Sequence, residues 1–76
     1  MKVCIFGADG RTGVEVVRRA IDKGFEVVAC VYNNNSDKYL PNNVLIKKGD
    51  VMNYEYVTEA MNGAEVVISV IGHIKG

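Results

Sequence analysis

Residues 7–13 read Gly7-Ala8-Asp9-Gly10-Arg11-Thr12-Gly13, and they set the architecture predicted for this chain. They follow a short apolar run, Val3-Cys4-Ile5-Phe6, and precede residues 14–23, in which apolar side chains recur with the period of a helix. A strand, a glycine-rich turn and a helix are therefore predicted in succession. That order is the context in which closely spaced glycines indicate dinucleotide binding.

Each glycine of this turn has its own predicted task. Gly7 can take a backbone angle that a side chain would forbid, so the chain can turn sharply off the strand. Gly10 has no Cβ and lets a pyrophosphate approach the backbone, and Gly13 lets the helix lie near the sheet. The N–H groups of Arg11 and Thr12 would point at the phosphates, and the helix dipole would add about 0.3–1 kcal/mol for a nearby anion. A glycine-rich turn that binds no nucleotide is the alternative interpretation.

The rest of the chain continues the alternation of strands and helices. The predicted strands are Lys2–Phe6, Glu26–Val31, 44–48 and 65–71, and the predicted helices are 11–23 and about nine residues that start after Asn53. Residues 33–43 are polar, carry Pro41 and are predicted to form a loop. Parallel strands in this succession give the spatial order 3-2-1-4. The predicted fold is α/β, a Rossmann-type parallel sheet that forms half of a doubly wound fold.

The two predicted helices differ in how clearly they show a buried side. Apolar residues of 11–23 fall on one side, charged residues on the other, and Gly24 ends the helix. In the second helix Tyr54, Val57 and Met61 are predicted to share the buried face, and Tyr56 is also interpreted as a packing residue.

The fourth strand is almost wholly apolar, which is typical of a strand that is buried on both faces. At the edge of a sheet it would be exposed, which natural proteins avoid. We therefore expect residues 1–76 to be the N-terminal dinucleotide-binding segment of a longer protein, or the fourth strand to pair with another copy of the chain.

Composition excludes several classes of function. The 76 residues are 49% hydrophobic and 24% charged with a formal net charge of zero, which argues against a nucleic acid partner. No apolar run reaches the roughly 18 residues that span a membrane, and no signal-peptide pattern is present, so a cytoplasmic protein is predicted.

Cys4 and Cys30 lie in apolar strands and are interpreted as two buried thiols in a reducing compartment. Two strand cysteines and one histidine make no metal site.

Three ordered blocks of the sequence carry a family resemblance. Residues 5–13 resemble the opening "IFGATGxTG" of the NmrA-like, atypical branch of the short-chain dehydrogenase/reductase superfamily. Lys48-Gly49-Asp50-Val51, Asn62-Gly63-Ala64 and Val67-Ile68-Ser69-Val70-Ile71-Gly72 resemble its second half, "GDV…GxDAVISxxG". Within this group the chain is most similar to NAD(P)H-dependent flavin reductases and biliverdin reductases. The resemblance implies transfer of hydride from a nicotinamide to a flavin, quinone or similar conjugated acceptor.

The resemblance also implies a set of cofactor contacts. The glycine turn would hold the pyrophosphate, Asp50 would accept a hydrogen bond from the adenine amino group, and Val51 would contact the ring. Residues 71–73 would pass near the nicotinamide half. The residues expected at the cofactor are Gly7, Asp9, Gly10, Arg11, Thr12, Gly13, Tyr32, Asp50, Val51, Ile71, Gly72 and His73.

Several of these positions have a second interpretation. Asp50 can simply start the turn that leads to Asn53, and His73 can be a solvated loop residue rather than an acid–base group. A cation such as Arg11 is disfavoured by the helix dipole at that end, unless an anion sits beside it. Asp9 stands where the family has a small neutral residue, so its carboxylate either caps the helix or repels the pyrophosphate.

The end of the second strand indicates the cofactor. Sites that prefer NAD place an acidic residue there, and this chain has Val31-Tyr32-Asn33-Asn34 instead. The family often has Arg where Tyr32 stands, so Arg11 and Lys38 are the remaining candidate cations, and Tyr32 can stack on adenine. NADP(H) is predicted over NAD(H).

No catalytic residue is predicted in this chain. The resemblance implies a Tyr-x-x-x-Lys pair, but Ser36, Asn43, Thr58 and Ala60 stand four residues after the tyrosines. The leading hypothesis is the NAD(P)-binding part of an oxidoreductase that does not turn over substrate alone. A non-catalytic NADP-sensing module of the NmrA-like type is the second hypothesis, and a binder of S-adenosylmethionine or FAD is the third.

Overall fold

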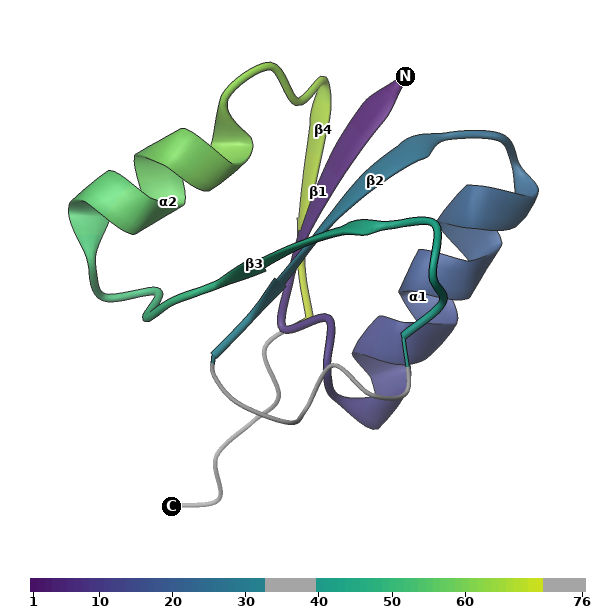
Figure 1. Cartoon of the computed structure of the whole chain (residues 1–76), viewed down its shortest axis with the longest axis horizontal. Helices are drawn as coiled ribbons and strands as arrows, with labels where there is room; N and C mark the ends of the chain where they lie inside the picture. The colour runs from purple at the N-terminus through teal and green to yellow at the C-terminus, as the bar shows by residue number, and fades with distance from the viewer. Residues whose placement is uncertain (33–39, 71–76) are drawn as a thin grey trace.

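The computed structural model of the chain describes residues 1–32 and 40–70, which form one parallel sheet between two helices (Figure 1). Its elements in chain order are β1 (Lys2–Phe6), α1 (Arg11–Asp22), β2 (Glu26–Val31), β3 (Leu45–Lys48), α2 (Tyr54–Met61) and β4 (Val66–Ser69). The predicted succession of elements is confirmed. The third and fourth strands are shorter than predicted, and the predicted residue Ile71 lies outside the described part of the chain.

The sheet has the order β3-β2-β1-β4 with every pairing parallel, as the sequence predicted. Alternate residues of β1 and β2 point to opposite faces, and after the first residues, Lys2 and Glu26, both strands carry apolar side chains on both faces. The face that carries Val3 and Ile5 packs on α1, and the face that carries Cys4 and Phe6 packs on α2. Figure 1 shows the two helices on opposite sides of the sheet.

Helix α1 presents the predicted face to the core. Gly13, Val17 and Ala20 are buried, while the charged residues of this helix are exposed. After its C-cap at Lys23 the chain turns through Gly24, whose φ of 84° is in the left-handed region that a side chain disfavours. The glycine therefore ends the helix and returns the chain into β2 within a few residues.

Helix α2 presents a different face from the predicted one. Tyr54 is 81% exposed and Met61 is 36% exposed, so the predicted stripe of Tyr54, Val57 and Met61 is wrong at both ends. The residues that pack on the sheet are Tyr56, Val57 and Ala60. On so short a helix, either a face with Tyr54 or a face with Tyr56 could have packed on the sheet. The face with Tyr56 does so, because the ring of Tyr56 fits against Gly49, which has no side chain.

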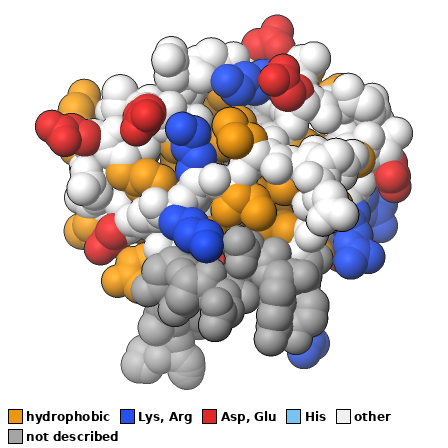
Figure 2. All heavy atoms as spheres, in the orientation of Figure 1, with side chains coloured by type: hydrophobic (Ala, Val, Ile, Leu, Met, Phe, Trp, Pro, Cys, Tyr) orange, Lys and Arg blue, Asp and Glu red, His pale blue; other side chains and the backbone are white. Residues whose placement is uncertain are grey.

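Strand β4 is an open edge among the described residues. It pairs with β1 on one side only, and Val66 and Val67 are 38% and 46% exposed. Within residues 1–32 and 40–70 the apolar strand is thus not covered on both faces. Acidic and basic side chains are scattered over the face seen in Figure 2, with exposed hydrophobic side chains between them. None of the helices in the described residues is both long and apolar enough to cross a membrane.

Candidate functional site

The glycine turn is fastened to the end of the neighbouring strand. Gly7 has a φ of 78°, as predicted for a sharp turn off β1. The amides of Gly7 and Ala8 both donate to the carbonyl oxygen of Cys30 at 3.1 Å, and the amide of Gly10 donates to that of Gly7 at 3.3 Å. These bonds fix the turn before any ligand arrives.

Gly13 and Gly10 are glycines for different reasons. A Cβ on Gly13 would overlap the carbonyl oxygen of Gly7 and lie 2.7 Å from Cα of Ala8, so only glycine lets α1 pack this closely. A Cβ on Gly10 would meet nothing nearer than the Gly7 oxygen at 3.8 Å, and the φ of −79° at Gly10 suits any residue. The fold therefore requires Gly13 but does not require Gly10.

Helix α1 begins without a side-chain cap. Its N-cap is Gly10, no side chain of the described residues caps it, and its first turn contains no acidic residue. The capping role considered for Asp9 is therefore not the one observed. The first amides of a helix have no partner within the helix, so those that open α1 point out of the fold. They lie at a hollow of about 430 Å³ lined by Asp9, Gly10, Arg11 and Val14.

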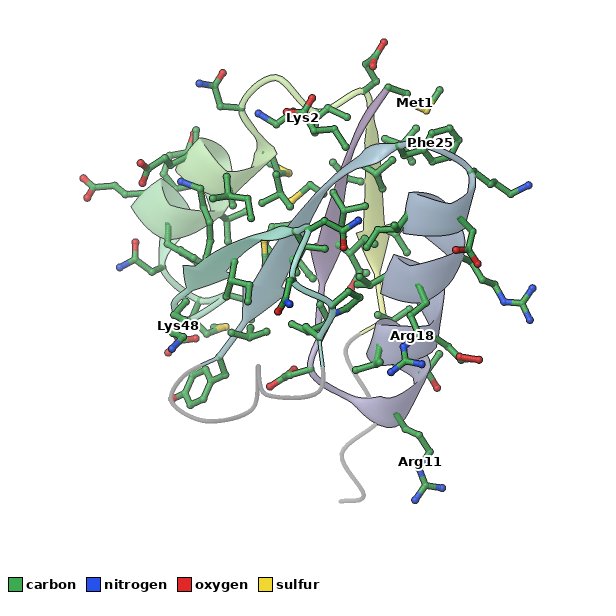
Figure 3. The ribbon with its side chains drawn as sticks, turned by 45° about the vertical axis from the view of Figure 1, so that its right-hand side comes forward. Met1, Lys2, Arg11, Arg18, Phe25 and Lys48 are labelled. Carbon is green, nitrogen blue, oxygen red and sulfur yellow. The ribbon has the colours of Figure 1, made fainter. Side chains whose placement is uncertain are left out.

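Arg11 lies at the mouth of this hollow. It is exposed, and Figure 3 shows its side chain directed away from the ribbon where α1 begins. Met1, Lys2 and Phe25 lie at the opposite end of the sheet in the same view. Uncapped amides, the positive end of a helix dipole and a guanidinium together favour an anion.

Backbone hydrogen bonds bring the ends of all four strands together around this turn. The amide of Val70 after β4 donates to Phe6 at 2.9 Å, and the amide of Gly49 after β3 donates to Val31 at 3.0 Å. Since the strands are parallel, these ends meet at one edge of the sheet, where Rossmann-type folds bind ligands. Tyr32 follows β2 at this edge and is 60% exposed.

Asp50 and Val51 follow β3 at the same edge. The carboxylate of Asp50 accepts the amide of Met52 at 2.9 Å, and its backbone oxygen accepts the amide of Asn53 at 2.8 Å. Asp50 therefore does start the turn that leads to α2. That bond uses one of its two carboxylate oxygens. Val51 is 42% exposed and offers an apolar surface beside it.

Tyr56 is a residue that the sequence marked only for packing. Its hydroxyl donates to the backbone oxygen of Lys47 at 3.0 Å and lies 3.5 Å from that of Val31. Burial, followed by the nearby Cys30 thiol, raises the pKa of Tyr56 well above its ordinary value of 10.0. The hydroxyl thus remains a donor. The sequence signal was the glycine at position 49, whose open side accepts the ring.

Cys4 and Cys30 are the two buried free thiols that the sequence predicted. Their sulfur atoms are 3.6 Å apart between β1 and β2. Burial, and next the hydrogen bond with Cys4, raises the pKa of Cys30 to about 12, and burial also raises the pKa of Cys4. Neutral buried thiols are poor nucleophiles, so this pair contributes packing rather than chemistry.

The predicted site residues thus divide into two groups. Ile71, Gly72, His73 and the candidate cation Lys38 lie outside the described residues. The other predicted residues gather at the edge where the strands end, on the turn after β1, after β2 and after β3. Within residues 1–32 and 40–70, His, Cys, Asp and Glu side chains form no group of three or more that could hold a metal ion.

Comparison with known proteins gives one family. The sequence model of a family described as NAD(P)H-binding matches residues 7–76, which is nearly the whole chain.

Solved structures share the fold over nearly the whole chain. A UDP-glucose 4-epimerase matches with a TM-score of 0.82 at 15% identity, over 99% of this chain and 24% of that one. A short-chain dehydrogenase/reductase superfamily protein from Agrobacterium tumefaciens with bound NAD gives 0.79 at 17%, over 100% and 21%. The dTDP-glucose 4,6-dehydratase of Bacillus anthracis in complex with NAD gives 0.80 at 14%, over 96% and 27%. The chain therefore spans about a quarter of the length of these structures, and at such identities the likeness establishes the fold.

Proposed function

The chain belongs to the NAD(P)H-binding family, and from this premise we propose that the start of α1 binds the pyrophosphate of a nicotinamide dinucleotide. The observation that carries the proposal is Gly10. The fold does not need a glycine there, since a Cβ would have open space, and Ser, Thr, Asp or Asn would cap the helix better. A residue without a side chain at this position leaves the amides of α1 open to an anion.

The remaining contacts follow the edge of the sheet. Gly7 and Gly13 shape the turn, and the amides of Arg11 and Thr12 donate to the phosphates. Tyr32 stacks on adenine, Asp50 accepts a hydrogen bond from the adenine amino group with the oxygen that the turn does not use, and Val51 packs on the ring. Ile71, Gly72 and His73, which follow β4 in the sequence, are proposed as contacts of the nicotinamide half.

Substitution of Gly10 by alanine tests this placement. We expect Gly10→Ala to weaken NADPH binding about tenfold or more, because its methyl group would keep a phosphate oxygen away from the amides of α1. The loss of one charge-assisted hydrogen bond costs about 1.5–3 kcal/mol. Isothermal titration calorimetry measures the change, and circular dichroism checks that the variant is folded. Glu15→Ala, on the exposed side of the same helix, is the control and should bind as the wild type does. Unchanged affinity in folded Gly10→Ala would refute the proposal.

We propose NADP(H) as the preferred cofactor. Val31 ends β2 and Tyr32 follows it, where a site that prefers NAD has an acidic residue, so no carboxylate at these two positions repels a 2′-phosphate. Fluorescence titration with NADPH and with NADH compares the two affinities. Tighter binding of NADH would reject the preference.

For the reaction, we propose that this chain is the NAD(P)-binding segment of a longer oxidoreductase that reduces a flavin, a quinone or a similar conjugated acceptor. The reduced nicotinamide supplies the hydride, and the residues of this chain bind and orient the cofactor. The alternative is a non-catalytic sensor that binds NADP. An oxidoreductase consumes NADPH when flavin or quinone is added, whereas a sensor binds NADPH without consuming it.

Two further proposals concern the surroundings of the protein. The free thiols of Cys4 and Cys30, only 3.6 Å apart, fit a reducing compartment, and we place the protein in the cytoplasm. The open edge of β4 fits pairing with further sheet, either from a longer chain or from a second copy.

A further inference from the structure

The hydroxyl of Tyr56 joins the ends of two strands. Tyr56 belongs to α2, yet its hydroxyl donates to the backbone oxygen of Lys47 at 3.0 Å, on β3, and lies 3.5 Å from that of Val31, on β2. Val31 is the last residue of β2, and Lys47 is the last but one of β3. A side chain that only filled the layer between helix and sheet would need no polar atom there.

The ring of Tyr56 also fits against Gly49. A Cβ on Gly49 would lie 2.6 Å from Cε1 of Tyr56 and closer still to Cδ1, so the ring occupies the space that a side chain would take. The amide of Gly49 donates to Val31 at 3.0 Å. The end of β2, the start of the loop after β3 and the tyrosine thus form one packed unit.

The other end of the loop is held by the N-cap of α2. The side chain of Asn53 accepts the amide of Tyr56 at 3.1 Å, and the amide of Asn53 donates to the backbone oxygen of Asp50 at 2.8 Å. Residues 49–53 are therefore fixed at both ends, by the ring of Tyr56 at Gly49 and by the cap of α2 at Asn53, and the exposed Asp50 and Val51 lie between.

We propose that Tyr56 is a positioning residue that sets the loop of Asp50 and Val51 for the adenine half of the cofactor. The inference rests on the proposed function, because it assumes that this loop meets adenine. Tyr56 is 9 residues from Lys47 and 25 from Val31 in sequence, so the effect depends on the folded arrangement. The raised pKa of Tyr56, caused first by burial, keeps its hydroxyl protonated and able to donate.

Two fragments of the cofactor separate this role from a general structural one. Adenosine probes the loop after β3, and inorganic pyrophosphate probes the glycine turn after β1. In wild-type protein, titration followed by amide chemical shifts should place pyrophosphate on residues 7–13 and adenosine on residues 49–52. Tyr56→Phe should weaken adenosine about fivefold through loss of one hydrogen bond and leave pyrophosphate unchanged.

The matched control is Tyr54→Phe. This variant also removes one tyrosine hydroxyl from α2, but Tyr54 is 81% exposed. Adenosine and pyrophosphate should therefore bind to it as they do to the wild type. Gly49→Ala is the second variant, because its new methyl group displaces the ring while the hydroxyl is kept. It should show the same selective loss of adenosine binding, and it supplies the test if Tyr56→Phe does not fold.

Each outcome decides one claim. Selective loss of adenosine in Tyr56→Phe or Gly49→Ala supports the positioning role. Equal loss of both fragments, or unchanged adenosine binding, overturns that role and leaves the proposed function standing if wild type binds NADPH. Failure of the wild-type protein to bind NADPH or either fragment overturns the proposed function itself.

Discussion

Two glycines at the start of α1, Gly10 and Gly13, differ in whether the fold requires a residue without a side chain. Gly13 lies where backbone meets backbone, and any side chain there would push the helix off the turn. Gly10 lies three residues earlier with open space beside it. Glycine is thus required by packing at position 13 but not at position 10, where we propose that it gives a ligand access to the amides, and substitution distinguishes the two.

Gly13→Ala should destabilise the protein. Its Cβ would overlap the carbonyl oxygen of Gly7, so the backbone of the turn or the helix must shift, which costs about 1–3 kcal/mol or more. Urea denaturation measures the free energy of unfolding. Gly10→Ala is the comparison and should lose at most about 1 kcal/mol, as a weaker N-cap. An equal loss in the two variants would contradict the distinction drawn between these glycines.

Asp9→Ala should tighten NADPH binding. The carboxylate of Asp9 lines the hollow where the phosphates are proposed to lie, and it caps no amide of α1. Like charges about 4 Å apart repel by about 1 kcal/mol in water, which corresponds to about fivefold in affinity. Titration at low and at high salt measures the gain, which should shrink as salt screens the repulsion.

Asp22→Ala is the control for this variant. Asp22 is exposed at the other end of α1, about 15 Å or more away along the helix axis and beyond the screening length of physiological salt. It should bind NADPH as the wild type does. Weaker binding of NADPH by Asp9→Ala would mean that the carboxylate has a structural or ligand-binding task instead.

At the scale of elements, the layer between α2 and the sheet makes stability depend on pH. The thiols of Cys4 and Cys30 and the phenol of Tyr56 lie in it, and burial raises the pKa of all three. In the unfolded chain the thiols ionise near their ordinary value of 9.0, whereas folded Cys30 holds its proton to about 12. Stability from Cys30 is therefore complete below about pH 9 and is lost as the pH rises towards 12.

Urea denaturation at several pH values tests this dependence. The free energy of unfolding should fall by up to about 1.4 kcal/mol per thiol for each pH unit above about 9. Cys30→Ala should start lower, because it leaves a cavity, but should fall less steeply. A wild-type stability that stays level or rises between about pH 9 and about pH 10 would contradict the expected sign.

What the sequence could predict at this scale was decided by local patterns. The turn after β1 and the buried side of α1 follow from glycine spacing and helical period, which act within a few residues. The face of α2 does not, since both Tyr54 and Tyr56 fit an apolar stripe. The choice was made by Gly49, which is visible in the sequence although its contact with Tyr56 is not, and by backbone carbonyls near the ends of β2 and β3, which leave no mark in the sequence. The turn and the strand order, from which the candidate site was predicted, were therefore open to sequence reasoning, whereas the contacts of Tyr56 were not.

At the scale of the whole molecule, the two edges of the sheet differ in chemistry. β3 ends in Lys47 and Lys48, and charged side chains at an edge discourage pairing with another chain. β4 reads Val66-Val67-Ile68-Ser69 and carries no charge. Its valines are 38% and 46% exposed among the described residues. The hydrophobic effect and unpaired backbone groups therefore both favour association at β4.

We expect the protein to self-associate through β4 as its concentration rises. Sedimentation velocity over a range of concentrations should show a larger species whose share grows, and Val67→Lys should shift that equilibrium towards monomer, since a lysine must then be buried beside the new strand. Leu45→Lys is the matched control, because Leu45 is 54% exposed on the opposite edge strand and gains the same charge. Equal effects of the two lysines would assign the change to charge in general. A wild-type protein that stays monomeric at every concentration would show that this edge is covered in another way.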